Sequence, residues 1–286
     1  MMPNITTLVD DINDVIKGLK GWDKAIGSHM GDAIADIYNN RFGKPQEPRG
    51  YLSMSSLGTV CDRKLWYKIN KTELGEPLQA NALLKFSYGD MLEELMLCLV
   101  EQAGHTVTGK QDRMEAHGIK GSRDCVIDGM TVDIKSASSF SFQKFKNNEL
   151  RTKDPFGYIS QLSSYVYAAK NDPLVENKTH GSFLVVDKVN GSICLDTYDF
   201  TEELEKKEED IKRIKAVVKN KLIPNRGFED EPQTKTSPNR KLCMTCSYCE
   251  FKKACHPNLK LFKYANGPVY LTKVAKHPNI AEAKNW

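Results

Sequence analysis

The chain has 286 residues, of which 40% are hydrophobic and 27% are charged, and its formal net charge is +4. This composition is typical of a water-soluble globular protein and excludes the disordered and fibrous classes. No apolar run approaches the roughly 20 residues of a membrane span, and the first residues lack a signal-peptide pattern, so we expect a cytoplasmic protein.

The first fifty residues are expected to form a helical extension. Apolar residues recur at helical spacing over residues 5–20, and a second helix is expected over 31–39. After a Gly- and Pro-rich loop, Ser55 or Ser56 can cap a further helix that runs into Cys61. A single cysteine in such a segment is ordinarily a core residue.

A long helix is expected over residues 79–103, because apolar side chains there share one face. Glu93 lies in the same row of this helix as Gly89 and Leu97, away from the polar stripe. A carboxylate in an apolar row needs a partner. The alternative is an ordinary surface glutamate at the edge of the row.

A tight β-hairpin is predicted between His117 and Ser139. Asp128-Gly129 is a dipeptide preferred in type I′ turns, and alternating apolar-rich segments flank it. A two-residue loop fixes the register and places Asp124 opposite Asp133 on the neighbouring strand.

The two facing aspartates suggest a cation site. Side chains of such a pair lie about 5 Å apart and repel by roughly 3 kcal/mol at an effective dielectric of 20. A divalent cation between Asp124 and Asp133 would remove this repulsion. In water the repulsion falls below about 1 kcal/mol, so a solvated polar face that also carries Lys135 is the alternative.

Residues 140–153 combine basic and aromatic side chains, which suits a groove that binds nucleic acid through phosphate contacts and base stacking. An amphipathic surface segment is the alternative. The basic residues are Lys144, Lys146, Arg151 and Lys153, and the aromatic ones are Phe140, Phe142 and Phe145.

Asp154-Pro155 is a typical start of a helix, and along that helix Gln161 and Tyr165 share one face. A second hairpin is predicted to turn at Asn190-Gly191. A charged amphipathic helix over residues 201–222 and a proline-containing linker over 223–240 follow.

Four cysteines, Cys243, Cys246, Cys249 and Cys255, fall within thirteen residues. The last three form a C-x2-C-x5-C pattern, which indicates a bound metal or cluster in a cytosolic protein. A 4Fe-4S cluster needs four thiolates. One possible set is the four local cysteines as a zinc site. Residues 251–286 then hold seven lysines and one acid, a basic tail that suggests a polyanionic partner.

These motifs resemble those of the PD-(D/E)xK nuclease superfamily. Asp124 is similar to its second motif and Asp133-Ile134-Lys135 to its third, although Arg123 stands where the name-giving proline would be. Glu93, four residues after a glycine, resembles the first motif of the RecB-like branch. Gln161-x3-Tyr165 resembles a further motif that borders the active site in that branch.

The cysteines resemble the iron-sulfur staple of CRISPR-associated exonucleases and of the AddB-type nuclease domain. In those families one upstream cysteine joins a C-terminal C-x2-C-x5-C, and Cys61 matches the upstream position. The resemblance therefore implies a cluster held by Cys61, Cys246, Cys249 and Cys255.

The resemblance implies an α/β (α+β) fold of the restriction-endonuclease type, a mixed sheet flanked by helices. The implied domains are an N-terminal helical extension over 1–50, a stapled nuclease domain over 51–260 and a basic tail over 261–286. Magnesium or manganese would be held by Glu93, Asp124, Asp133 and the Ile134 carbonyl. Lys135 would orient the attacking water, with Gln161 and Tyr165 beside it.

The implied activity is hydrolysis of DNA from single-stranded ends, in phage or mobile-element recombination, repair or CRISPR-like processing, with a recombination or CRISPR-type protein as a partner. The alternatives are an endonuclease on the same site, a non-catalytic DNA-binding or recombination-partner protein, and a zinc-binding structural protein.

Overall fold

The computed structural model describes residues 4–43, 49–284 and 286, which form two compact units. Unit 1 takes in residues 4–43, 52–58 and 79–211, and unit 2 takes in the remaining described residues. No helix among the described residues is both long and apolar enough to cross a bilayer.

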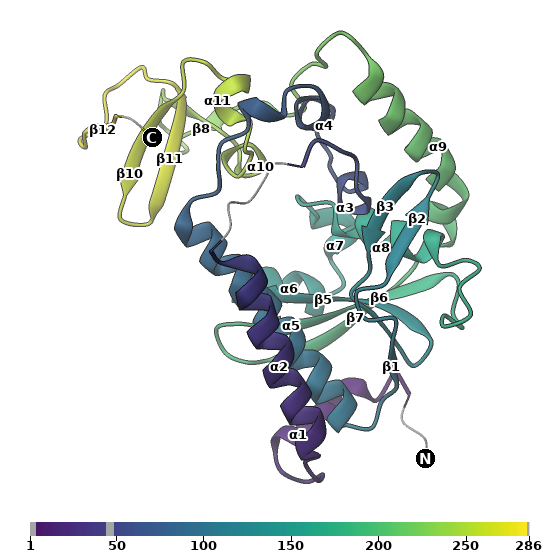
Figure 1. The fold of residues 1–286 in the computed structure, drawn as a ribbon. Helices are drawn as coiled ribbons and strands as arrows, with labels where there is room; N and C mark the ends of the chain where they lie inside the picture. Colours follow the sequence, from purple (N-terminus) through teal and green to yellow (C-terminus); the bar gives the residue numbers. More distant parts are fainter. Residues whose placement is uncertain (1–3, 44–48, 285) are drawn as a thin grey trace. The chain divides into compact units, whose positions relative to one another are not determined.

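Unit 1 is built on a five-stranded mixed sheet with the strand order β1-β4-β5-β6-β7 (Figure 1). The central strands β5 and β6 are parallel, and the other neighbours are antiparallel. The mixed sheet with flanking helices confirms the predicted fold class. The strands are β1 (Val107–Thr108), β4 (Cys125–Ile127), β5 (Met130–Ala137), β6 (His180–Asp187) and β7 (Ile193–Asp199).

The predicted hairpin is formed by β4 and β5. Asp128 and Gly129 both have positive φ, 47° and 76°, as a type I′ turn requires. Cys125 pairs with Val132 and Ile127 with Met130, which is the predicted register. The face that carries Asp124, Asp133 and Lys135 is only partly solvated, because Asp133 is 2% exposed and the other two residues are half-buried.

Helices cover both faces of this sheet. On one face, α1 and the C-terminal half of α5 pack against apolar side chains of β4, β5 and β6. On the other face, α6 and α8 contribute to a second apolar cluster with β6 and β7. The helices of unit 1 are α1 (Leu8–Ile16), α2 (Lys24–Arg41), α3 (Met54–Leu57), α5 (Ala80–Gln102), α6 (Ser139–Lys146), α7 (Leu150–Lys153) and α8 (Tyr158–Ala168).

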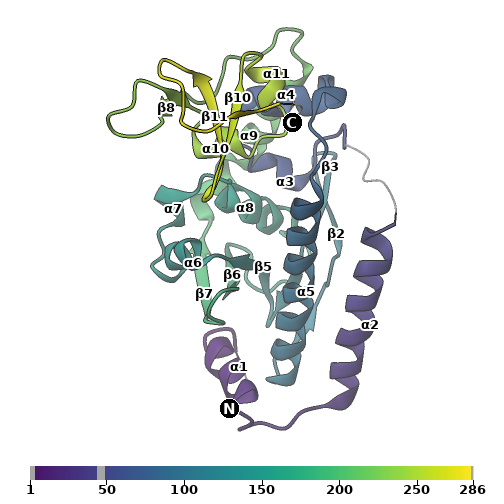
Figure 2. The same ribbon diagram turned by 90° about the vertical axis from the view of Figure 1, so that its left-hand side faces the viewer.

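The N-terminal helices belong to unit 1. Leu8 and Ile12 of α1 are fully buried in the first core cluster. Helix α2 runs alongside α5 (Figures 1 and 2), although none of its residues is fully buried. A separate small hairpin, β2 (Arg113–Ala116) with β3 (Ile119–Ser122), precedes the central one.

Unit 2 contains a second five-stranded sheet, in the order β12-β10-β11-β9-β8. No strands were predicted after residue 240, whereas the basic C-terminal segment contributes three of these five. The strands are β8 (Glu231–Pro232), β9 (Arg240–Lys241), β10 (Lys260–Tyr264), β11 (Gly267–Lys273) and β12 (Glu282–Ala283).

Short helices accompany this sheet, and a small apolar cluster of Trp66, Tyr67 and Phe251 lies among them. The long helix α9 (Thr201–Lys219) starts in the residues of unit 1 and ends in those of unit 2. The helices of unit 2 are α4 (Asp62–Asn70), the 3-10 helix η1 (Thr72–Leu74), α10 (Met244–Ser247) and α11 (Lys252–Cys255).

Candidate functional site

Three carboxylates of unit 1 influence one another's ionisation. Asp124 directly precedes β4, Asp133 lies on β5 and Glu93 lies on α5. Asp133 is buried, and the other two residues are half-buried. The Oδ2 atom of Asp124 accepts a hydrogen bond of 2.8 Å from the backbone N–H of Ile134. The hairpin register therefore brings Asp124 next to the backbone of β5.

The crowding of these carboxylates disfavours their charged forms. Burial and the nearby charge of Asp124 raise the pKa of Glu93 from 4.5 to about 8. Burial and the charge of Asp133 raise the pKa of Asp124 from 3.8 to about 7. A cation between these groups would favour their ionised forms.

Lys135 lies on β5 two residues after Asp133 and forms an ion pair with it. Burial alone would lower the pKa of Lys135, but the charges of Asp133 and Asp124 outweigh burial and raise it above its ordinary value. The ammonium group lies over the ring of Tyr158, 5.5 Å from the ring centroid. Lys135 is therefore a protonated group held between a carboxylate and an aromatic ring.

The helix α8 brings Gln161 and Tyr165 to the same site. The predicted start at Asp154-Pro155 is three residues too early, because the helix begins at Tyr158 with Gly157 as its N-cap. The carboxylate of Asp154 still accepts hydrogen bonds from the N–H groups of Gly157 and Ile159, at 2.8 and 2.9 Å. Burial and the charge of Asp133 raise the pKa of Tyr165 to about 12, and Gln161 forms a hydrogen bond with it.

The donor set fits a hard divalent cation in its chemistry, because such ions prefer carboxylate and carbonyl oxygens. The Oδ2 atom of Asp133 is buried and has no hydrogen-bond partner among the described residues, its neighbour being the Lys135 ammonium. Among the residues that the structure describes, no three or more His, Cys, Asp or Glu side chains are arranged so that they could hold a metal ion. The carboxylates contact protein donors instead.

The basic residues after β5 differ in their surroundings. Lys144 and Lys146 lie on α6, and the Lys144 ammonium lies over the exposed ring of Phe140. On α7, Arg151 forms an ion pair with Glu203, and Lys153 forms one with Glu149. Two of the interleaved aromatics, Phe142 and Phe145, are buried in the second core cluster and cannot stack on bases there.

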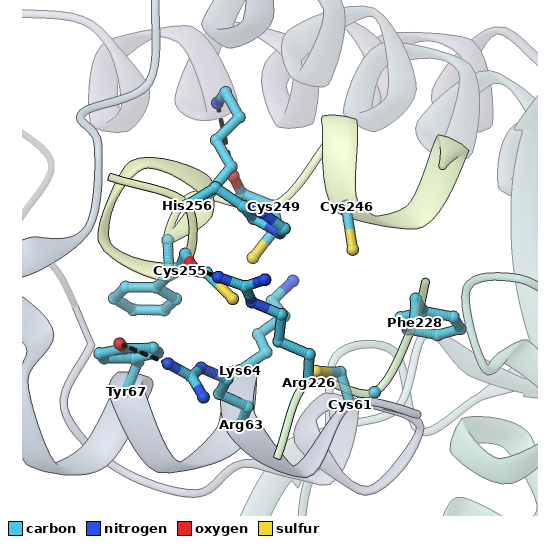
Figure 3. Close-up of a pocket in the computed structure, with 13 residues that line it drawn as sticks. Cys61, Arg63, Lys64, Tyr67, Arg226, Phe228, Cys246, Cys249, Cys255 and His256 are labelled. Carbon is cyan, nitrogen blue, oxygen red and sulfur yellow. Dashed lines mark hydrogen bonds between the residues drawn. The ribbon is translucent and has the colours of Figure 1, made fainter. Parts of the chain in front are cut away.

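In unit 2, one pocket is lined by Cys61, Cys246, Cys249 and Cys255 (Figure 3). Cys61 directly precedes α4, and the other three come from the segment around α10 and α11. Burial and the charge of Glu250 raise the pKa of the Cys249 thiol to about 11. Residues separated by nearly two hundred positions thus share one cavity wall.

Basic side chains line the same pocket. They include Arg63, Lys64 and Arg226, and Arg226 donates a hydrogen bond of 2.8 Å to the carbonyl of Cys255 (Figure 3). Cys243 is not among the residues that line this pocket, although its thiol contacts that of Cys246.

Sequence reasoning missed two residues of the carboxylate site. Tyr158 supplies the ring beneath Lys135, and Gln111 donates a hydrogen bond of 2.6 Å to Glu93. Tyr158 lies one turn before Gln161 on α8, so helical spacing could have found it. Gln111 lies in a loop, where no periodicity points to it.

Comparison with known proteins identifies the family of this chain. The sequence matches the PD-(D/E)XK nuclease superfamily over residues 24–256. A search of the curated proteins finds no match to it. Among solved structures, the crystal structure of SSO0001 matches with 14% identity and a TM-score of 0.38, covering 79% of this chain and 94% of that one. Because this family match covers most of the chain, the chain belongs to the PD-(D/E)XK nuclease superfamily.

Proposed function

We propose that this protein is a metal-dependent DNA exonuclease that hydrolyses phosphodiester bonds from single-stranded ends. The observation that carries this proposal is the grouping of Glu93, Asp124 and Asp133 with the protonated Lys135 in unit 1. A module that only binds DNA has no use for buried carboxylates whose charges repel both one another and the DNA backbone.

The oxygens of Glu93, Asp124 and Asp133 and the Ile134 carbonyl would hold magnesium or manganese. When bound, such an ion lowers the pKa of a water ligand and offsets charge on the scissile phosphate. Lys135 donates hydrogen bonds toward the attacking water and stabilises the negative charge that develops on the phosphate.

Two neighbours hold Lys135 in position for this role. The ring of Tyr158 restricts the ammonium from one side, and Asp133 attracts it from another. Gln161 and Tyr165, which are hydrogen bonded to each other, border the site from α8 and orient the DNA strand.

Binding of a single strand is supported by side chains on α6. The exposed ring of Phe140, with the Lys144 ammonium over it, offers a stacking surface next to a phosphate contact. Lys146 extends the basic surface, whereas Arg151 and Lys153 are engaged with Glu203 and Glu149 and contribute less. The setting, in phage or mobile-element recombination, repair or CRISPR-like processing, rests on the family resemblance alone.

The proposal includes a 4Fe-4S cluster held by Cys61, Cys246, Cys249 and Cys255. Its support is that these four thiols line one pocket, with basic side chains that suit a negatively charged cluster. Such a cluster would tie α4 to the C-terminal part of unit 2 and stabilise that unit by restricting the unfolded chain. A zinc ion held by the local set of Cys243, Cys246, Cys249 and Cys255 is the alternative.

The test is degradation of end-labelled linear single-stranded DNA and of circular single-stranded DNA, with Mn2+ or Mg2+. We expect metal-dependent loss of the linear substrate, no loss of the circle, and a rate lower by at least about 100-fold in Asp133→Ala and Lys135→Ala. Lys120→Ala, which changes an exposed lysine of the β2–β3 hairpin, is the matched control and should retain activity.

Each of the remaining outcomes would indicate a different function. Cleavage of the circle would identify an endonuclease on the same site. Equal inactivity of the wild type and both variants, in folded protein that binds DNA, would identify a non-catalytic DNA-binding protein.

A further inference from the structure

Gln111 joins two of the carboxylate-bearing segments of unit 1. Its Nε2 atom donates a hydrogen bond of 2.6 Å to Oε1 of Glu93 on α5. Its backbone N–H donates a hydrogen bond of 3.0 Å to the carbonyl oxygen of Asp124, just before β4. One loop residue therefore contacts both the helix that carries Glu93 and the strand entry that carries Asp124.

The backbone of this loop has an uncommon conformation. Gln111 has a φ of 52°, in the left-handed region that costs a non-glycine residue about 1–2 kcal/mol. Gly109, two residues earlier, has a φ of 58°. Since Gln111 is not a glycine, the loop keeps this conformation only where its surroundings enforce it.

The surroundings that enforce it are the contacts of Arg123, which is 1% exposed. The Arg123 guanidinium donates to Asp172 at 2.6 Å, to Asp112 at 2.8 Å and to the carbonyl of Gly109 at 3.3 Å. A Cβ atom on Gly109 would lie only 2.3 Å from Nη2 of Arg123, so the loop wraps closely around the guanidinium. This buried cation fixes the loop from which the Gln111 amide reaches Glu93.

We infer that Gln111 is a positioning residue that orients Glu93 for the divalent cation. This inference rests on the nuclease site proposed above. By occupying Oε1 of Glu93, the amide leaves Oε2 for the metal and restricts rotation of the carboxylate. An amide does so without a positive charge, so the carboxylate keeps its full attraction for a cation.

The competing possibility is a surface hydrogen bond of little consequence, since Gln111 is exposed and water can replace its amide. The two possibilities differ in what they predict for metal binding. A positioning residue affects the affinity for the cation, whereas a surface contact does not.

The experiment measures Mn2+ affinity by calorimetric titration of the wild type, Gln111→Gly and Gln111→Met. Glycine suits the positive φ and therefore retains the fold, and methionine keeps the length but lacks the donor. We expect both variants to bind Mn2+ about tenfold more weakly. His117→Gly, at another positive-φ position in the β2–β3 turn, is the matched control and should bind like the wild type.

Kinetics provide a second readout that a merely structural role would not produce. In both variants the Mn2+ concentration for half-maximal DNA cleavage should rise by the same factor, with the rate at saturating Mn2+ close to that of the wild type. Unchanged affinity in both variants, with a wild type that binds Mn2+ and cleaves DNA, would overturn the inference and leave the proposed function intact. A wild type that neither binds Mn2+ nor cleaves DNA would overturn both.

Discussion

The backbones of Gly58 and Gly157 meet so closely that neither residue has room for a side chain. A Cβ atom on Gly157 would lie 1.6 Å from the carbonyl oxygen of Gly58, and one on Gly58 would lie 2.3 Å from that of Gly157. Gly157 directly precedes α8, the helix that carries Gln161 and Tyr165. This crossing of two backbones therefore positions the helix that borders the carboxylate site.

Replacing Gly157 with alanine should destabilise the protein strongly. The methyl group would overlap a backbone atom, and the residue would keep a φ of 75°, so we expect the free energy of unfolding to fall by at least about 2 kcal/mol. Urea unfolding measures this loss. Gly191→Ala is the matched control, because its φ is 76° and nothing lies within 4 Å of its Cβ position. Equal losses in the two variants would contradict the crowding argument.

His105 connects α1 to the turn of the central hairpin. Its fully buried ring lies with Nδ1 2.6 Å from Asp128 and Nε2 3.3 Å from Asp11. His105→Phe keeps the ring volume but removes the ring nitrogens that contact both carboxylates, which leaves Asp11 with Lys20 and Asp128 with the Thr106 N–H. We expect a loss of about 2–3 kcal/mol in unfolding free energy. His29→Phe on the exposed surface of α2 should cost little, and a similar cost at both positions in thermal unfolding would argue against the role of His105.

Features with local causes could be predicted from the sequence. The Asp128-Gly129 turn and its register follow from the φ preferences of two residues, and the structure confirms both. The long helix predicted over residues 79–103 extends from Ala80 to Gln102, although Leu84, Tyr88 and Leu95 of its predicted apolar face are exposed. Fold class followed from such elements and from the family resemblance.

Features with long-range causes could not be predicted. The contact between Gln111 and Glu93 depends on a loop wrapped around Arg123, whose partner Asp172 is 49 residues away. The hairpin of β10 and β11, by contrast, is local and was missed although Asn266-Gly267 at its turn is a hairpin signal; only its pairing with β9 and β12 is long-range. The two-unit division, in which unit 2 combines residues 59–78 with the C-terminal part, is equally non-local.

In the absence of divalent metal, the protein should lose stability as the pH rises. Glu93 has a pKa of about 8 in the folded state against 4.5 ordinarily, and Asp124 has about 7 against 3.8. At pH values between the ordinary and the raised pKa of each group, the folded state binds more protons than the unfolded state. The free energy of unfolding therefore falls with increasing pH in this range. Urea unfolding in EDTA across this window measures the slope, and Glu93→Gln should reduce it.

Added Mn2+ should reverse this effect. A cation that binds the ionised carboxylates of the folded state stabilises it most where those groups are charged, at the alkaline end of the window. A Tm shift that grows with pH in the wild type and shrinks in Glu93→Gln is the expected result. A Tm shift that is independent of pH in both proteins would indicate that Mn2+ does not bind at these carboxylates.

The cysteine set can be resolved by comparing Cys61→Ser with Cys243→Ser. Cys61 lines the pocket with Cys246, Cys249 and Cys255, whereas Cys243 does not line it. Loss of one of four thiolates should therefore remove most of the bound iron and sulfide in Cys61→Ser. The same change at Cys243 should leave the metal content near that of the wild type. Iron, sulfide and zinc analysis of the purified proteins measures this.

The reverse pattern would identify the local zinc site. If Cys243→Ser loses zinc while Cys61→Ser retains it, the four cysteines from Cys243 to Cys255 form the site and Cys61 is only a pocket residue. The stability of unit 2 then distinguishes the two arrangements independently of metal analysis. A staple through Cys61 closes a far longer loop than the local site, so its loss should lower the Tm more than loss of Cys243 does.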